Sequence, residues 1–164
     1  SKSYTSSLIF EKLRKKYPKI MTRLYSYYTT GKDRATPWNK VMFDKTMPLF
    51  NYPDFIRSLQ TNRFVFEPCS YHTYGRTSVD CAALGIPMVG SNRVMSMRYC
   101  FPNMSCETYD AKAILSIMDK ILSDKEWLDE QMKYAYKQCE YFNYENAEKR
   151  YNLMVEETRI TCKK

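Results

Sequence analysis

The chain has 164 residues, of which 44% are hydrophobic and 27% are charged. This length and composition are typical of one folded domain, and they exclude a disordered chain. The net charge of +8 favours acidic partners such as nucleotide phosphates, anionic lipid headgroups or nucleic acid, although a solvated basic surface needs no partner. No apolar run is long enough to cross a bilayer. We expect a cytoplasmic protein that can lie at the periphery of a membrane.

Six cysteines and the single histidine, His72, bear on metal binding and redox state. No CxxC pair occurs, so the spacing typical of zinc ligands is missing. No signal peptide is recognisable, and we therefore expect reduced cysteines that act as small apolar residues. The sequence predicts neither a metal site nor a cofactor.

The first half of the chain alternates short strands with short helices. Ser6 or Ser7 can cap the first helix and Pro18 ends it, while Pro53 suits the first turn of a later helix. In chain order we expect a helix over about 7–17, a β-rich run over 21–28, a strand over 41–44, a helix over 54–60, a strand over 64–66, a helix over 76–84 and a strand over 86–89.

The last third of the chain is predicted to be helical. Ile114, Met118 and Ile121 recur at helical spacing. The segment from Ser123 to Glu126 reads as a capping box that starts a helix running to about residue 141. Asn143 can cap a final helix over about 144–159, whose apolar residues are Ala147, Tyr151, Met154 and Val155.

This order of elements predicts an α/β fold: a Rossmann-like three-layer domain with a mostly parallel sheet and a helical C-terminal third, formed by residues 1–164 as a single domain. Ligands of such sheets bind outside the carboxyl ends of the strands. The loop within 67–80 follows a predicted strand and therefore lies at one of those ends.

The segment 67–91 is the most informative part of the sequence. It predicts a strand, a loop with Gly75, a short helix, a tight turn and a second buried strand. Backbone N–H groups at the start of such a helix suit a phosphate. Asp80 lies one turn beyond Arg76, so its carboxylate can accept hydrogen bonds from a ligand at the helix start. The segment therefore predicts a site for a nucleotide-like anion.

Gly75, Arg76 and Thr77, followed by Asp80-Cys-Ala-Ala-Leu-Gly-Ile-Pro-Met-Val, resemble the donor-site signature of retaining family 4 glycosyltransferases. Asp80 stands at the second acidic position of that signature, and Ala82, Gly85 and Pro87 fall at matching places. Residues 141–148 resemble the start of the last helix in that family. The resemblance is specific over 64–92 and architectural elsewhere.

The resemblance implies the B-type fold of two Rossmann-like domains, with this chain as the C-terminal, donor-binding half and the N-terminal acceptor domain absent. The first strand of the half is also absent, since the chain opens at the helix. The last helix would cross back toward the missing domain and expose apolar surface here. The implied substrate is a UDP-, GDP- or ADP-sugar, and the implied donor-binding residues are Thr73, Tyr74, Gly75, Arg76, Thr77 and Asp80.

Two further positions follow from the same resemblance. His72 stands eight residues before Asp80, where the family has an acidic residue that contacts the transferred sugar. It is the one candidate for a catalytic contact, and its alternative is a solvent-facing loop residue. Thr46, Met47 and Pro48 occupy the place of the base-contacting loop.

In glycosyl transfer the nucleoside diphosphate is the leaving group, so its charge must be stabilised. Backbone N–H groups of 73–77 and the helix dipole would do this without a metal, and Asp80 would orient the ribose. The resemblance implies retention at the anomeric carbon. Without the acceptor domain, the chain alone is expected to bind donor weakly and not to turn over.

Two other classes remain open at this point. One is a non-catalytic nucleotide-sugar-binding or regulatory module of the same fold. The other is a basic nucleic-acid-binding domain whose tyrosines stack on bases. The tyrosines are spread along the chain and no nucleic-acid-binding signature occurs, so nucleic acid is the least expected partner.

Overall fold

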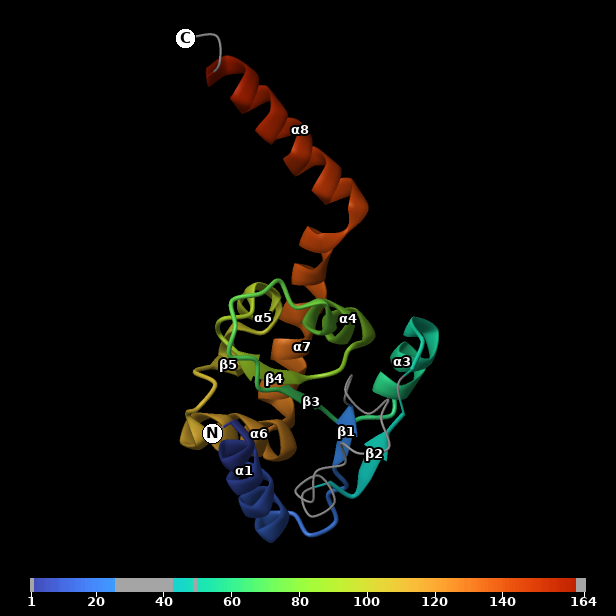
Figure 1. Cartoon of the computed structure of the whole chain (residues 1–164), viewed down its shortest axis with the longest axis vertical. Helices are drawn as coiled ribbons and strands as arrows, with labels where there is room; N and C mark the ends of the chain where they lie inside the picture. Colours follow the sequence, from blue (N-terminus) through green and yellow to red (C-terminus); the bar gives the residue numbers. More distant parts are fainter. Residues whose placement is uncertain (1, 26–42, 49, 162–164) are drawn as a thin grey trace.

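Two small parallel sheets lie side by side at the centre of the molecule (Figure 1). The computed structural model describes residues 2–25, 43–48 and 50–161. One sheet pairs β1 (Arg23–Tyr25) with β2 (Lys45–Met47). The other has the order β3-β4-β5, formed by β3 (Val65–Glu67), β4 (Met88–Ser91) and β5 (Ser105–Cys106). Every pairing is parallel, as the alternation of strands and helices predicts.

Helices cover both faces of the β3-β4-β5 sheet (Figure 1). On one face α4 (Arg76–Leu84), α5 (Met95–Cys100) and α7 (Lys125–Cys139) pack against one another. On the other face α1 (Lys2–Lys16) packs on α6 (Ala111–Ser123). The predicted three-layer α/β fold is therefore confirmed.

The hydrophobic core is centred on β4. All four of its residues are buried, and Met88 and Val89 are 0% exposed. A parallel strand that is covered on both faces reads as a continuous apolar run, which is why this segment is recognisable in the sequence. Ile114, Met118 and Ile121, predicted from their spacing to share one face of a helix, are buried on α6.

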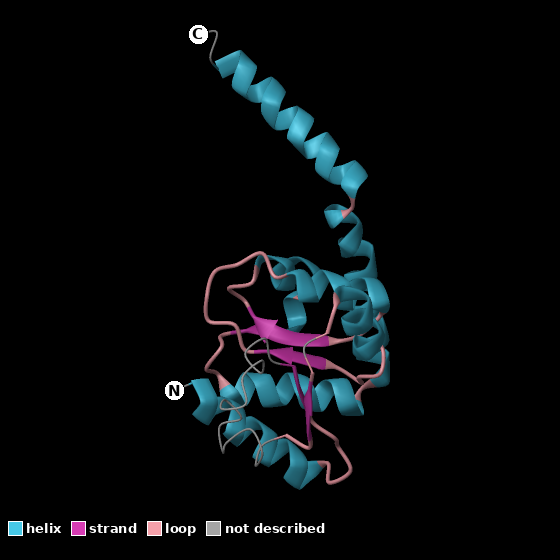
Figure 2. Cartoon of the chain, turned by 45° about the vertical axis from the view of Figure 1, so that its right-hand side comes forward, coloured by secondary structure: helices cyan, strands magenta, loops and turns pink. Residues whose placement is uncertain are grey.

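The C-terminal third is helical, as predicted, and its last helix leaves the body of the molecule. A 3₁₀ turn, η2 (Glu140–Phe142), joins α7 to α8 (Tyr144–Thr161), which extends away from the sheets (Figure 2). Asn143 caps α8 by accepting a hydrogen bond from the backbone N–H of Asn146 at 2.8 Å. Apolar side chains of α8, including Tyr151 and Met154, are exposed.

One predicted helix start and one predicted cap residue are wrong. The first helix begins at Lys2, so Ser6 and Ser7 lie inside it and do not cap it. The cap of α7 is Asp124, whose carboxylate accepts from the backbone N–H of Trp127 at 3.0 Å. Ser123 instead closes α6, where its hydroxyl donates to the carbonyl of Asp119. Aspartate and serine are both favourable N-cap residues, so the sequence alone does not distinguish Asp124 from the adjacent Ser123 as the cap.

The strand predicted over 41–44 is also misplaced. Residues 41 and 42 lie outside the described part, and the strand occupies Lys45–Met47. Asp44 is not extended into the sheet because its carboxylate accepts hydrogen bonds from the backbone N–H and the hydroxyl of Thr22 and pairs with Arg14 at 2.9 Å. These contacts pull the pKa of Asp44 below its ordinary value, chiefly through the backbone of Thr22.

The remaining elements differ from the prediction by small shifts or additions. The helix predicted over 54–60 is α3 (Tyr52–Leu59), with Asn51 as its cap. The strands predicted over 64–66 and 86–89 are shifted toward the C-terminus by one and two residues, respectively. α5, the 3₁₀ turn η1 (Pro102–Met104) and β5 were not predicted. Over the described ranges, no helix has the length and apolar character of a membrane span.

Candidate functional site

The loop between β3 and α4 lies at the carboxyl ends of β3 and β4, where the α/β fold places ligands. It is fastened to the segment that follows β4. The backbone carbonyl of Thr73 accepts from the N–H of Met95 at 2.8 Å, and that of Tyr74 accepts from the N–H of Ser96 at 3.0 Å. These two main-chain bonds fasten the site loop to the start of α5.

Gly75 caps the N-terminus of α4 in a conformation that requires glycine. Its φ is +76°, and a Cβ at this position would lie 2.1 Å from Cγ1 of the buried Val94. The hydroxyls of Ser78 and Ser96 both donate to its carbonyl, at 2.9 and 2.5 Å. The turn that aims α4 is thus fixed by steric constraint and by two buried hydroxyls.

The first turn of α4 has no side-chain cap. Its cap, Gly75, has no side chain, so no side-chain hydrogen bond closes the helix start. The first N–H groups of an α-helix have no partner within the helix, and they carry the positive end of its dipole. This geometry can bind an anionic group such as a phosphate.

Asp80 lies one turn further along α4, and the structure gives it two partners. The hydroxyl of Tyr52, the first residue of α3, donates to Oδ1 of Asp80 at 2.8 Å. Nε of Arg76 lies 3.8 Å from Oδ2, and the Arg76 guanidinium stacks 3.9 Å from the centre of the Tyr52 ring. The Asp80 side chain is only 13% exposed. Its carboxylate is consequently held in one orientation beside the helix start.

Tyr52 was not predicted as a site residue. The sequence signal available was its position just before Pro53, at the start of a helix, which says nothing about a contact with α4. The pairing of Tyr52 with Asp80 and Arg76 depends on how α3 lies against α4. Only the fold brings these three side chains together.

The other predicted site residues lie in different surroundings. His72 and Thr73 are exposed, while Thr77 is half-buried and faces a large cavity beside β3. Tyr74 turns its ring to Phe142 of η2, with ring centres 5.5 Å apart, and burial raises the pKa of its hydroxyl. The side chains of Arg76 and Asp80 thus lie together beside Gly75 at the helix start, whereas the side chains of Tyr74 and Thr77 face Phe142 and the cavity, respectively.

An aromatic cluster joins the site loop to the base of α8. Tyr99 stacks on Tyr141 at 4.8 Å, both rings contact Phe142, and the guanidinium of Arg150 lies 3.8 Å from the Tyr141 ring centre. Through Tyr74 this cluster reaches the loop that carries Gly75. A continuous set of ring contacts therefore runs from the site loop to the base of α8.

Glu67 is a second residue that the sequence analysis did not select. It ends β3 and lines the same cavity as Thr77, and its Oε2 atom is buried without a hydrogen-bond partner in the described part of the chain. Burial raises the pKa of this carboxyl above its ordinary value. An acidic residue directly after the apolar run Phe64–Phe66 is a signal that could have identified it.

The described residues contain no group of three or more histidine, cysteine or acidic side chains placed to hold a metal ion. The five described cysteines are free thiols. Burial raises the pKa of Cys100 to about 12 and that of Cys106 to about 11, so both are protonated and unreactive at neutral pH.

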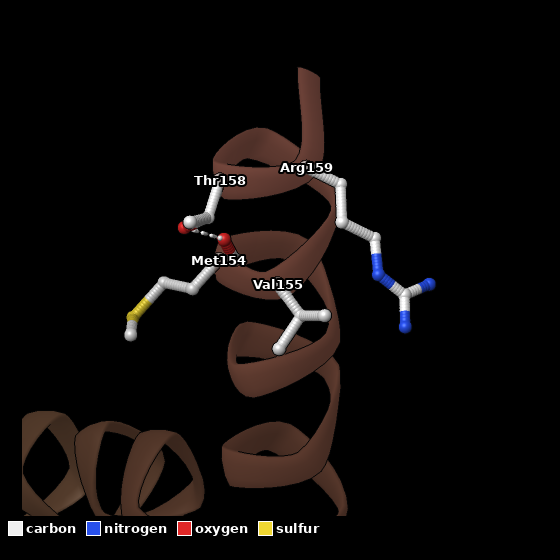
Figure 3. Close-up of a pocket in the computed structure, with 4 residues that line it drawn as sticks. All are labelled: Met154, Val155, Thr158 and Arg159. Atoms are coloured by element: carbon white, nitrogen blue, oxygen red, sulfur yellow. Dashed lines mark hydrogen bonds between the residues drawn. The ribbon is translucent and has the colours of Figure 1, made fainter. Parts of the chain in front are cut away.

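A shallow hollow of about 300 Å³ lies on α8 (Figure 3). Its described lining residues are Met154, Val155, Thr158 and Arg159, all from one helix. A single helix face cannot surround a ligand, so this hollow is not a candidate site.

Comparisons with known proteins add no family to this geometry. The chain matches no family model, no curated protein and no solved structure. The functional proposal therefore depends on the geometry of the site and on the sequence motif that forms it.

Proposed function

We propose that this chain is the donor-binding domain of a retaining glycosyltransferase. In this proposal the diphosphate of a nucleotide-sugar lies at the N-terminus of α4, and the ribose hydroxyls donate to Asp80. The observation that supports it most directly is the helix start at Gly75, which has no side-chain cap and carries Asp80 one turn away. The resemblance of the motif to the family 4 signature supplies the reaction class.

Asp80 can accept a ribose hydroxyl without losing its present partner. Tyr52 occupies Oδ1 at 2.8 Å, whereas the Arg76 contact to Oδ2 is long, at 3.8 Å. Oδ2 is therefore the atom we assign to the ribose. Arg76, whose side chain is 66% exposed, can turn its guanidinium toward a phosphate.

Transfer requires a leaving group whose charge is stabilised as the glycosidic bond breaks. In the proposed mechanism the backbone N–H groups of the first turn of α4 hold the departing diphosphate, with no metal taking part. His72 is exposed on the loop and is the candidate for a contact with the sugar. The acceptor would come from an N-terminal domain, so this domain alone is expected to bind donor and not to turn over.

Calorimetric titration tests the proposal. The chain is titrated with UDP, GDP, ADP and their sugar conjugates, and Asp80→Ala is expected to weaken the best ligand about tenfold, the effect of removing one charge-assisted hydrogen bond. Asp129→Ala is the matched control, because Asp129 is an exposed carboxylate on α7 paired with Lys125 at 2.8 Å. Absence of binding at millimolar nucleotide, or equal weakening by both variants, would contradict the proposal.

A nucleotide-sugar that binds through Asp80, with no transfer by the domain joined to its acceptor half, would identify a regulatory module instead. Binding of generic oligonucleotides that weakens steeply with salt would indicate a nucleic-acid-binding protein. His72→Glu restores the acidic residue of the family pattern. If His72 contacts the sugar, this variant changes affinity for the sugar conjugates but not for the free nucleotides.

A further inference from the structure

A cavity of about 1310 Å³ separates the two sheets. Residues 22–25 around β1 line one side of it and residues 64–67 around β3 line the other; we call it the inter-sheet slot. Phe10 and Leu13 of α1 contribute apolar walls. Figure 1 places β1 and β2 on one side of this region and β3, β4 and β5 on the other.

The backbone of β1 directs hydrogen-bonding groups into the inter-sheet slot. The carbonyl of Thr22 accepts from the N–H groups of Asp44 and Lys45, so residues 22 and 24 face β2. Backbone groups alternate between the two edges of a strand in a parallel sheet. Arg23 and Tyr25 therefore direct their N–H and C=O groups to the opposite edge, toward β3.

The backbone of β3 presents the complementary edge. Val65 donates its N–H to the carbonyl of Pro87 at 2.9 Å, so Val65 and Glu67 face β4. By the same alternation, Phe66 directs its N–H and C=O groups into the inter-sheet slot. Two strand edges, whose outward backbone groups have no strand partner among the described residues, thus border one largely apolar cavity. This is the environment that a central strand of a parallel sheet requires.

The connections of the chain indicate how that strand would be attached. Parallel neighbours are joined by a crossover helix, as α4 joins β3 to β4 and α5 joins β4 to β5. α1 precedes β1 and lines the inter-sheet slot through Phe10 and Leu13. In doubly wound sheets the first strand lies in the centre, between the second and fourth. α1 has the place of the crossover between such a strand and β1.

We propose that the inter-sheet slot receives one further β-strand, apolar and parallel to β1 and β3, joined to the N-terminal end of α1. Such a strand would merge the two sheets into one continuous sheet. It would bond to Arg23 and Tyr25 on one edge and to Phe66 on the other. Backbone N–H groups at its carboxyl end would reach Oε2 of Glu67, which is buried without a partner among the described residues. This inference is independent of the glycosyl-transfer proposal.

The experiment supplies the strand and measures backbone protection. A segment of about six alternating valines and isoleucines, the length of a typical strand, is appended before Ser1 through a linker of about three glycines and serines. The control is a segment of equal length with proline at every second position, which cannot donate to a ladder. Amide hydrogen exchange is read at Arg23, Tyr25 and Phe66, and the mass in solution is read by light scattering.

The proposal predicts a monomer in which exchange at Tyr25 and Phe66 slows about tenfold or more, the effect of one added backbone hydrogen bond. The amide of Val89, which is already within the buried sheet, gains less protection from exchange. The proline segment leaves all these amides unchanged. Unchanged exchange at Tyr25 and Phe66, equal protection by the proline segment, or assembly into oligomers with those amides still open would each overturn the proposal.

Discussion

The two sheets, which we call the β3-β4-β5 half and the β1-β2 half, differ in how well they are covered. The β3-β4-β5 half is covered by helices on both faces, its middle strand is buried, and the turn that carries Gly75 is closed by the hydroxyls of Ser78 and Ser96. The β1-β2 half has two strands of three residues each and borders the inter-sheet slot. The helix start of the candidate site lies on the β3-β4-β5 half, whereas Tyr52, which orients Asp80, lines the slot.

Substitution of Gly75 is expected to have the largest effect. In Gly75→Ala the new Cβ meets Val94 at 2.1 Å and φ stays positive. Left-handed strain and overpacking together cost about 3 kcal/mol of the free energy of unfolding, which urea denaturation measures. Gly85→Ala is the matched control, because φ there is +70° with nothing within 4 Å of the Cβ, and it costs about 1 kcal/mol. Equal losses would remove the steric argument.

Shortening one side chain in a strand of each half compares the packing of the two halves directly. Met88 is 0% exposed in β4, so Met88→Ala is expected to cost about 3 kcal/mol of the free energy of unfolding. Leu24 is only half-buried in β1, and Leu24→Ala is expected to cost less than about 1 kcal/mol because the side chain beside an open slot loses little packing. A larger loss from Leu24→Ala would mean that the β1-β2 half is the better packed.

Glu67 should make stability depend on pH. Its folded pKa is raised above the ordinary 4.5 by burial, so the folded chain keeps the proton where the unfolded chain has lost it. The free energy of unfolding therefore falls as pH rises from about 4.5 through the folded pKa. Glu67→Gln removes the contribution of Glu67 to this slope and raises stability at neutral pH by about 1 kcal/mol, because the amide carries no charge to desolvate. Denaturation across pH 4–8 checks the sign, and an identical slope in the variant would exclude Glu67 as its source.

The smallest expected effect concerns Tyr52. In Tyr52→Phe the hydroxyl that donates to Asp80 is lost, and a partly exposed hydrogen bond of this kind contributes about 0.5–1 kcal/mol. Tyr136→Phe is the control, because Tyr136 is 61% exposed on α7 and should change stability by less than about 0.5 kcal/mol. Thermal denaturation of the two variants side by side measures the difference. No difference would mean that the Tyr52 hydroxyl does not orient Asp80.

The sequence predicts best where local chemistry defines both ends of an element. α4 lies over the predicted residues because Gly75 and Gly85, both at positive φ, mark its start and its end. α5 was missed because six residues, Met95–Cys100, are too few to show a helical period. The sequence predicts the start of the first helix about five residues after its true start at Lys2, because serine caps some helices and lies inside others.

The site was predictable only in part, for a physical reason. The positions of Gly75, Arg76 and Asp80 relative to one another follow from spacing along a single helix. The contact of Tyr52 with Asp80 joins residues 28 positions apart, and it depends on tertiary packing that no local pattern records. The burial of Glu67 likewise depends on how the two sheets border the slot.

The most direct test of the account is to map where a nucleotide binds. The ¹⁵N-labelled chain is titrated with UDP, GDP and ADP while amide chemical shifts are recorded. We expect the largest changes at the amides of Gly75, Arg76 and Thr77, at the start of α4, with Asp80 also affected. Changes centred on the inter-sheet slot or on α8, or no change at millimolar nucleotide, would contradict it.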